Sequence, residues 1–214
     1  LLTALDIQYK GEDKDIKYIT DDSRKCCEAS LFICHENAHS YVDDALSRGA
    51  VFVISDEKLR ENSVAVTDTR KAFALLSAAF FENCHKGLRL IGVTGTNGKT
   101  TTASMIYTIL TVAGRRCGLI SSVSNNTCDG ESVAELTTPD CFSLHSMLSR
   151  MKDSGAEFCV IEASSQGLSQ QRLYGLSFEG AVLTNLASDH LDYHKTPENY
   201  KKAKLELFRN ASFS

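Results

Sequence analysis

The chain has 214 residues, of which 43% are hydrophobic, and a formal net charge of −4 at pH 7. This length suits one large domain or two small ones with a buried core. The negative balance argues against nucleic acid or an acidic membrane surface as a partner, and no run of eighteen apolar residues predicts a membrane span. The first residues form no signal peptide and include no initiator Met, so we expect a cytoplasmic chain clipped at its front.

The eight cysteines show no C-x-x-C pair and no Cys/His spacing typical of zinc sites. Several, such as Cys159, lie inside apolar segments. We therefore expect buried free thiols in a reducing compartment.

The first part of the chain alternates between predicted strands and helices, which indicates an α/β domain. Apolar runs predict strands over 16–20, 30–34, 50–55 and 64–66, with a helix over 41–47. A longer helix is expected from Thr69, which we assign as its N-cap, with Ala72, Phe73, Leu76, Ala79 and Phe80 on its apolar face. A polar break over 84–87 then predicts a domain boundary near residue 87.

The second part repeats the alternation and predicts a parallel sheet. A helix after Lys99 carries a predicted stripe of Met105, Ile106, Ile109, Leu110 and Ala113. Residues 118–121 predict a strand, 124–131 a loop and 142–152 a helix. The runs 158–161 and 181–183 are typical of parallel strands covered on both faces. We expect a small N-terminal α/β domain, 1–87, and a second, truncated parallel-sheet domain, 88–214.

A phosphate-binding loop is indicated by residues 90–102, L-I-G-V-T-G-T-N-G-K-T-T-T. Glycines let backbone N–H groups turn toward an anion, and the following helix presents its positive end to the same point. Lysine then meets the outer phosphates and threonine a Mg²⁺ ion. The strict pattern places glycine where this chain has Val93, with Gly92 one position early. The alternative is a glycine turn before a helix that happens to begin with Lys-Thr. The predicted ATP-binding residues are Gly95, Thr96, Asn97, Gly98, Lys99, Thr100 and Thr101. With this loop, we expect 88–214 to be a truncated P-loop parallel-sheet ATPase domain.

Polar side chains follow three predicted strands at the edge where parallel sheets bind ligands. Lys99 and Thr100 follow the first, Glu162 the second and Asp189-His190 the third. Glu162 is a candidate Mg²⁺ ligand facing Thr100, and His190 a candidate ligand of a second metal. Taken singly, each could instead be a capping glutamate or a surface histidine.

Lys204 lies on the apolar stripe of the last predicted helix, four residues after Tyr200. Thr196 is the expected N-cap of this helix and Pro197 its first residue. One interpretation is a lysine that extends its ammonium out to solvent. The other is a buried lysine whose lowered pKa makes a neutral amine available.

Several motifs resemble the Mur ligases, the ATP-dependent amide-forming enzymes of peptidoglycan synthesis. T-G-T-N-G-K-T-T is similar to their ATP loop. T-N-L-A-S-D-H-L-D-Y-H, residues 184–194, closely resembles a motif of the UDP-N-acetylmuramoyl-tripeptide synthetases, the MurE branch. E-A-S-S-Q-G-L, residues 162–168, resembles their E-x-S-S-H-G-L, with Gln166 in place of the histidine, and residues 136–139 resemble their T-T-P segment.

The resemblance implies roles for particular residues. It implies that Lys204 is carbamylated and that the carbamate helps to hold Mg²⁺, in addition to the candidate metal ligands Thr100, Glu162 and His190. Lys99, Lys204 and His190 would be the catalytic residues. The implied contacts with the muramoyl-peptide substrate are Thr137, Thr138, Ser164, Gln170 and Arg172, and the D-S-R motif places Ser23 at the uridine end. The segment 34–39 is shorter than the corresponding uridine-contacting loop of the family.

The implied function is an ATP-dependent ligase, a monomer, that adds the third amino acid to a UDP-N-acetylmuramoyl dipeptide through an acyl phosphate. ATP and Mg²⁺ are the expected cofactors. The family's C-terminal amino-acid-binding domain has no counterpart in 1–214, so we expect this stretch alone to be inactive, and the identity of the third amino acid stays open. Two alternatives are a folylpolyglutamate synthetase-like ligase and a non-catalytic nucleotide- or UDP-sugar-binding remnant.

Overall fold

The computed structural model describes residues 1–9, 11–187 and 189–213, and the chain divides into two compact units, Leu1–Phe80 and Phe81–Ser214. Among the described residues, no helix is long and apolar enough to cross a membrane.

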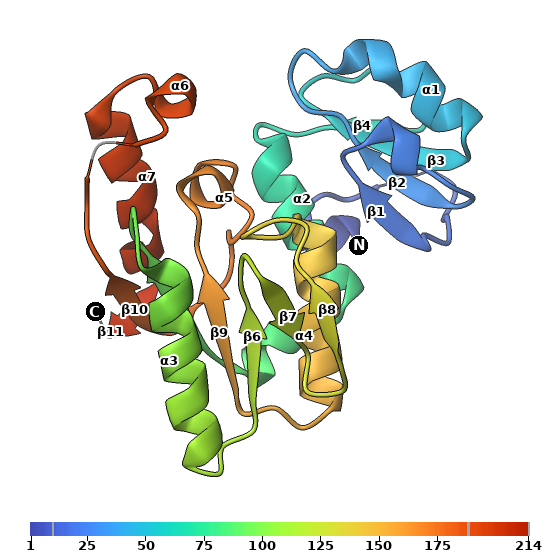
Figure 1. Cartoon of the computed structure of the whole chain (residues 1–214). Helices are drawn as coiled ribbons and strands as arrows, with labels where there is room; N and C mark the ends of the chain where they lie inside the picture. Colours follow the sequence, from blue (N-terminus) through green and yellow to red (C-terminus); the bar gives the residue numbers. More distant parts are fainter. Residues whose placement is uncertain (10, 188, 214) are drawn as a thin grey trace. The chain divides into compact units, whose positions relative to one another are not determined.

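The first unit is built on a parallel sheet of four strands in the order β1-β2-β3-β4 (Figure 1). Its buried core includes Phe32 and Val53 of the sheet and Val42 and Ala45 of helix α1. The elements are η1 (Leu2–Leu5), β1 (Tyr18–Thr20), η2 (Ser23–Lys25), β2 (Ser30–Ile33), η3 (His39–Tyr41), α1 (Val42–Ser47), β3 (Ala50–Ser55), β4 (Ser63–Ala65) and α2 (Thr69–Phe80).

The predicted N-cap of α2 is wrong by one residue. The backbone N–H groups of Arg70 and Lys71 donate to Oδ1 of Asp68 at 3.1 and 3.0 Å, so Asp68 is the cap. Thr69 is the first helical residue, and its hydroxyl lies 2.9 Å from Nδ1 of His35. The carboxylate of Asp68 reaches the free N–H groups, while Thr69 bonds to another segment.

The second unit holds a seven-stranded sheet in the order β11-β10-β5-β9-β6-β7-β8. The strands from β11 to β6 run parallel, and β7 and β8 add an antiparallel hairpin at one edge. The elements are η4 (Cys84–Gly87), β5 (Arg89–Thr94), α3 (Lys99–Val112), β6 (Cys117–Ile120), β7 (Ser124–Asn126), β8 (Glu131–Val133), α4 (Cys141–Asp153), β9 (Phe158–Glu162), α5 (Ser165–Ser169), β10 (Phe178–Leu183), α6 (Leu191–His194), α7 (Pro197–Arg209) and β11 (Ala211–Phe213).

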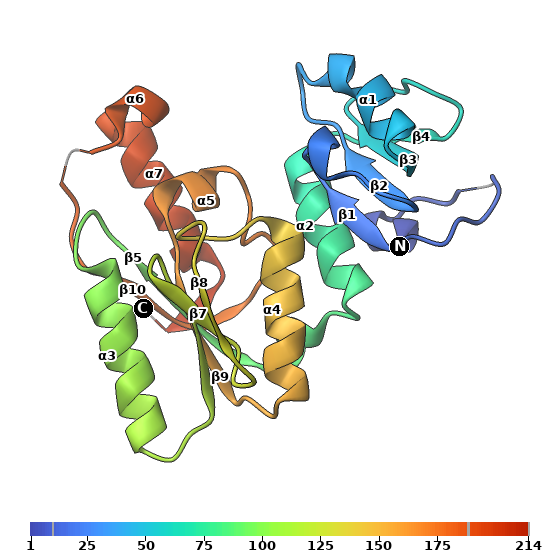
Figure 2. The same cartoon turned by 45° about the vertical axis from the view of Figure 1, so that its right-hand side comes forward.

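Helices cover both faces of this sheet, as Figure 2 shows for α3 and α4. Alternate strand residues point to opposite faces. Val93 and Val160 pack with Ala103 of α3 on one face. Leu90 and Ile161 belong to the core that α4, α5 and α7 complete on the other. This double coverage explains the continuous apolar runs of the central strands.

Gly92, which stands one position early for the strict phosphate-loop pattern, has a packing role. A Cβ atom there would lie only 2.7 Å from Cδ1 of Leu207. Glycine therefore lets α7 approach the centre of the sheet, and this places the residues of α7 beside the loop that follows β5.

The predicted loop over 124–131 is wrong, because its two ends form strands. Asn125 pairs with Ser132 in the antiparallel β7–β8 hairpin, and its side-chain oxygen accepts a hydrogen bond from the Ser121 backbone. The residues of β8 are all exposed. Polar side chains are compatible with this position, since an edge hairpin is held by backbone hydrogen bonds and buries little apolar area.

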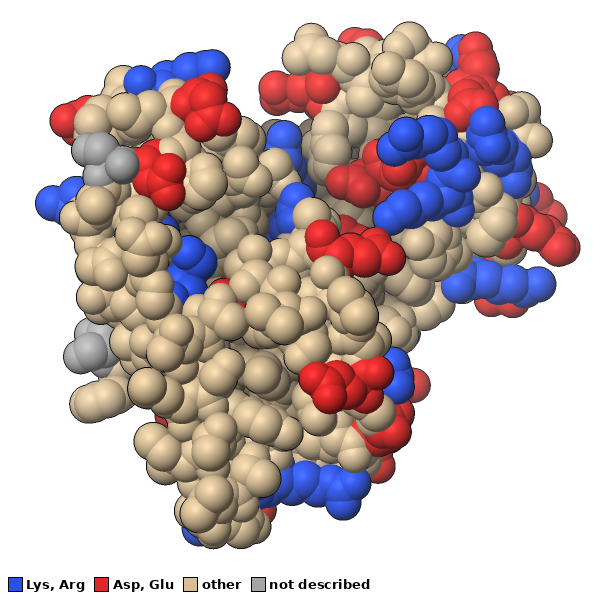
Figure 3. Space-filling model, in the orientation of Figure 1, with Lys and Arg blue, Asp and Glu red and all other residues tan. Residues whose placement is uncertain are grey.

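The predicted apolar stripe of α3 is also wrong in part. Ile106 and Leu110 pack against the sheet, but Met105 and Ile109 are 59% and 67% exposed. Ala113 lies just beyond the helix and is exposed. Figure 3 shows the outward face of α3 almost without charged side chains. Periodicity detected an apolar helix, but the sheet covers only a narrow strip of it.

Candidate nucleotide-phosphate site

The loop between β5 and α3 turns on two glycines. Gly95 has φ of +148° and Gly98, the N-cap of α3, has φ of +81°. L-residues rarely adopt such backbone angles. The loop delivers Lys99 and Thr100 to the first turn of α3, where N–H groups have no intrahelical partner and the helix dipole is positive. This is the local geometry of an anion site.

Two residues of the segment after β10 fix this loop. The Thr184 hydroxyl donates to the Asn97 carbonyl at 2.6 Å, and the Asn185 side chain donates to the same oxygen at 3.0 Å. Asn185 Oδ1 also accepts from the Asn97 N–H at 3.0 Å. A Cβ atom at Gly95 would lie 1.9 Å from Thr184 Oγ1. The loop conformation is therefore set from outside as well as by its own glycines.

Two lysines meet on one carbonyl oxygen of the loop. Lys99 Nζ donates to the Gly95 and Thr96 carbonyls, both at 3.0 Å, and Lys204 Nζ donates to the Gly95 carbonyl at 2.7 Å. Of the two interpretations of Lys204, the structure favours the buried lysine, because the residue is only 2% exposed. Burial, followed by the charge of Lys99, lowers the pKa of Lys204 from 10.5 to about 8, while Asp189 opposes the shift.

Glu162 and Thr100 face each other, as the order of the strands predicts. The Thr100 hydroxyl donates to Glu162 Oε2 at 3.1 Å, and the backbone N–H of Ser122 donates to Oε1 at 3.1 Å. Glu162 is fully buried at the end of β9. A carboxylate and a hydroxyl are hard oxygen donors, so the pair fits Mg²⁺. Among the described residues, no group of three or more His, Cys, Asp or Glu side chains could hold a metal.

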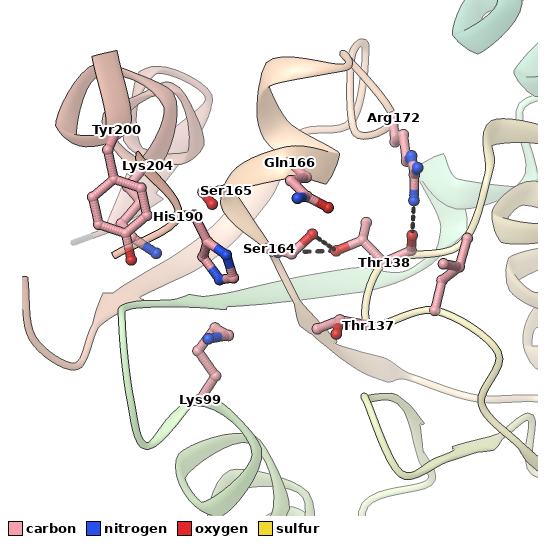
Figure 4. A pocket seen from close by; sticks show the side chains of 11 residues that line it. Lys99, Thr137, Thr138, Ser164, Ser165, Gln166, Arg172, His190, Tyr200 and Lys204 are labelled. Atoms are coloured by element: carbon pink, nitrogen blue, oxygen red, sulfur yellow. Dashed lines mark hydrogen bonds between the residues drawn. The ribbon is translucent and has the colours of Figure 1, made fainter. Parts of the chain in front are cut away.

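One pocket of about 180 Å³ collects most of the other candidate residues (Figure 4). It is lined by Lys99, Leu136, Thr137, Thr138, Ser164, Ser165, Gln166, Arg172, His190, Tyr200 and Lys204. Its cationic residues come from three places in the sequence, and none of the ion pairs found among the described residues involves Lys99, Arg172 or Lys204. The pocket therefore presents three cationic side chains without an ion pair among the described residues, which suits a polyanion.

Hydrogen bonds fix the guanidinium of Arg172 at one end of this pocket. Its Nη1 donates to the Thr138 carbonyl at 2.5 Å, and its Nε and Nη2 donate to Gln170 Oε1 at 3.0 and 2.6 Å. Gln170 is thus connected to the pocket by its hydrogen bonds with Arg172. The Thr138 hydroxyl lies 3.1 Å from Ser164 Oγ, and Ser164 caps α5 by accepting from Gly167 N. These neutral partners leave the guanidinium charge free for an acidic ligand.

His190 follows β10 at the head of α6, with an unusual backbone φ of +50°. Figure 4 shows its ring in the same space as Lys99 and Lys204. Its Nε2 lies 3.6 Å from Asp189 Oδ2, and its side chain is half exposed. The structure thus places His190 with Lys204 in the pocket, whereas Glu162 and Thr100 form a separate pair.

Ser23 lies in the first unit, apart from these residues in the chain. It is 6% exposed, and its side chain is hydrogen-bonded to Asp44, which helps to lower the pKa of that carboxyl. Within the segment 34–39, His35 contacts Thr69 and Asp21, and His39 contacts Asp56 at 2.7 Å. The two histidines of this short segment are therefore occupied by contacts inside their own unit.

Comparison with known proteins bears on this arrangement. The family model of the Mur ligase middle domain matches residues 93–214, which is more than half of the chain. The chain belongs to this family. The match begins inside β5 and includes the phosphate loop, Glu162, His190 and Lys204, so the residues gathered in the second unit all lie within the Mur ligase middle domain.

Two relatives share the name UDP-N-acetylmuramoyl-L-alanyl-D-glutamate--2,6-diaminopimelate ligase. The protein of Clostridium perfringens is 41% identical over all of this chain and 46% of its own length. The protein of Parabacteroides distasonis is 42% identical over 92% of this chain and 43% of its own length. A solved structure with the same name has a TM-score of 0.84 at 31% identity, covering 99% of this chain and 46% of that one. The chain thus spans less than half the length of these relatives.

Sequence reasoning assigned no role to Thr184, Asn185 or Tyr200. Thr184 and Asn185 stand in the quoted T-N-L segment, directly after a predicted strand whose carboxyl end meets the loop edge. Strand order alone could have suggested them. Tyr200 lies on the predicted apolar stripe of the last helix, and only the folded structure shows its hydroxyl 2.9 Å from Thr96 Oγ1.

Proposed function

We propose that the chain forms the nucleotide- and acceptor-binding part of an ATP-dependent ligase that adds the third amino acid to a UDP-N-acetylmuramoyl dipeptide. The observation that carries this proposal is the meeting of Lys99 and Lys204 on the Gly95 carbonyl, beside the Glu162–Thr100 pair. Two cations and a hard-oxygen pair around a glycine loop suit a nucleotide triphosphate with its metal. The relatives' names support 2,6-diaminopimelate as the third amino acid and favour this reaction over folylpolyglutamate synthesis.

The reaction would proceed in two steps. An oxygen of the dipeptide's terminal carboxylate attacks the γ-phosphorus of ATP, the bond to ADP breaks, and an acyl phosphate forms. The amine of the third amino acid then attacks the acyl carbon, phosphate leaves, and the amine loses a proton.

In this chain, Lys99 would leave its two carbonyl partners and neutralise charge on the transferring phosphoryl group. Arg172 would hold an acidic group of the acceptor. Thr137, Thr138, Ser164 and Gln170 would surround that group, and Ser23 would contact the uridine end. The loop residues Gly95 to Thr101 would bind the phosphates.

Mg²⁺ fits the oxygen donors of Thr100 and Glu162 and, when bound, would neutralise phosphate charge. We propose that Lys204 adds a further oxygen donor as its carbamate, near His190. The neutral amine attacks CO₂, an N–C bond forms, and one amine proton passes to solvent. The pKa of about 8 leaves a useful fraction of neutral amine near pH 7.5. Intact-mass measurement should show an adduct of one CO₂ that acid removes and that Lys204→Ala lacks. An unmodified lysine in CO₂-equilibrated buffer would contradict the carbamate.

The function is tested with a chimera in which this chain replaces the matching segment of the C. perfringens relative. The chimera receives ATP, Mg²⁺, the UDP-N-acetylmuramoyl dipeptide and a mixture of amino acids that includes 2,6-diaminopimelate. We expect a tripeptide product by mass spectrometry, lost in the Lys99→Ala chimera. A folded chimera that binds ligands but makes no product would instead support the non-catalytic alternative.

A further inference from the structure

Helix α7 contacts the phosphate loop at two consecutive residues. Lys204 reaches the Gly95 carbonyl, and the Tyr200 hydroxyl lies 2.9 Å from Thr96 Oγ1. Tyr200 and Lys204 stand one turn apart on the same helix face. Tyr200 is 2% exposed and is among the largest fully buried side chains of the described residues.

The hydrogen bonds of the Thr96 hydroxyl use its whole capacity. It donates to the Ala187 carbonyl at 3.1 Å and accepts from the Ala187 N–H at 3.0 Å. A hydroxyl has one proton to donate and two lone pairs, so the remaining bond must come from Tyr200 as donor. One buried oxygen thus joins the loop, the segment after β10 and helix α7.

The ring of Tyr200 is fixed as well as its hydroxyl. It lies edge-on to His194 with ring centroids 5.3 Å apart, and Lys204 Nζ lies 4.5 Å from its centroid. The phenol therefore has little freedom to turn away, and its contact with Thr96 is set by packing on the helix.

We propose that Tyr200 is a positioning residue that fixes the phosphate loop on α7 through the hydroxyl of Thr96. The inference rests on the proposed function in so far as the loop binds phosphate. Lys204 can hold the loop only while its nitrogen bonds to Gly95, and a role as metal ligand would draw it away. The Tyr200–Thr96 pair involves no charge, so it keeps the loop on the helix when Lys204 engages another partner.

The test compares Tyr200→Phe, which removes only the hydroxyl, with Tyr107→Phe. Tyr107 lies on α3, and its hydroxyl pairs with Thr111, away from the pocket. In the ligand-free chain, hydrogen exchange at the N–H groups of Thr96 and Asn97 should become about 5-fold faster in Tyr200→Phe, as expected for one lost hydrogen bond. The Tyr107→Phe control should leave both rates unchanged.

Binding provides a second measurement. Tripolyphosphate, which carries phosphates without a base, and ATP should both bind about 5-fold more weakly to Tyr200→Phe. Adding Thr96→Val to Tyr200→Phe should weaken binding no further than Thr96→Val alone, because both changes remove the same bond. Unchanged exchange in Tyr200→Phe, or additive effects in the double variant, would overturn the positioning role. If the wild-type chain binds neither phosphate probe, the proposed function fails, while the exchange result still decides the role of Tyr200.

Discussion

Replacing Lys204 by methionine should stabilise the ligand-free protein while destroying its site. Burial lowers the pKa of Lys204 from 10.5 to about 8. That difference corresponds to about 3.4 kcal/mol of unfavourable free energy for the folded ammonium. The charged hydrogen bond to the Gly95 carbonyl offsets about 1.5 kcal/mol. Methionine has a similar length and no charge, so Lys204→Met should raise the free energy of unfolding by about 2 kcal/mol at pH 7.

The effect should depend on pH in a defined direction. Because the pKa is lower in the folded state, the unfolded state binds more protons between about pH 8 and 10.5, and wild-type stability rises across that window. The advantage of Lys204→Met should therefore be full at pH 7 and shrink at pH 10.5. Urea unfolding in CO₂-free buffer, monitored by circular dichroism, measures the free energy of unfolding of both proteins at pH 7 and at pH 10.5. Lys202→Met, at an exposed position of the same helix, is the matched control. The expectation is refuted if Lys204→Met is less stable than the wild type at pH 7, or if the difference in free energy of unfolding between the two proteins does not change with pH.

Two further substitutions probe the loop and the core of the second unit. Gly95→Ala should destabilise the unit by at least about 2 kcal/mol and abolish phosphate binding. The added Cβ would overlap Thr184 Oγ1, and the backbone conformation at this position favours glycine. An unchanged melting temperature of the variant would contradict this expectation. His145 is fully buried, and neither of its ring nitrogens has a hydrogen-bond partner among the described residues. Burial lowers its pKa to about 3. Below pH 6.5 only the unfolded state is protonated there, so stability should fall by about 1.4 kcal/mol per pH unit down to pH 3. His145→Leu should flatten that dependence in denaturant titrations, and an equally steep slope in the variant would assign it to other groups.

Much of the fold could be predicted because the local signals agree with the tertiary structure. The central strands are continuous apolar runs that helices cover on both faces, and Thr196 and Pro197 mark the start of α7 as expected. The sequence could place Lys204 on the apolar face that Tyr200, Ala203 and Leu207 define, but it left open whether the ammonium is buried or extends to solvent.

The predictions that are wrong concern segments in which tertiary contacts outweigh the local pattern of apolar and polar residues. Asn125 and its polar neighbours belong to the β7–β8 hairpin at the sheet edge because the edge offers backbone partners, which no side-chain periodicity reveals. Met105 and Ile109 are apolar yet exposed, since the sheet covers only one strip of α3. Within the site, the Glu162–Thr100 pair could be predicted, because both residues follow strands whose carboxyl ends meet at the same edge of the sheet. The shared Gly95 carbonyl and the Tyr200–Thr96 bond depend on the approach of α7 that Gly92 permits, and spacing along the chain does not encode it.

The loop between β5 and α3 is proposed to bind nucleotide phosphates together with Mg²⁺. The most direct measurement is a calorimetric titration of the chain with ATP, with and without Mg²⁺, in parallel with the Lys99→Ala variant. We expect Mg²⁺-dependent binding by the wild type and its loss in Lys99→Ala, because the lysine supplies the mobile cation at the outer phosphates. Equal affinity of the two proteins for ATP, or an affinity for ATP that does not change when Mg²⁺ is added, would contradict the assignment of this loop.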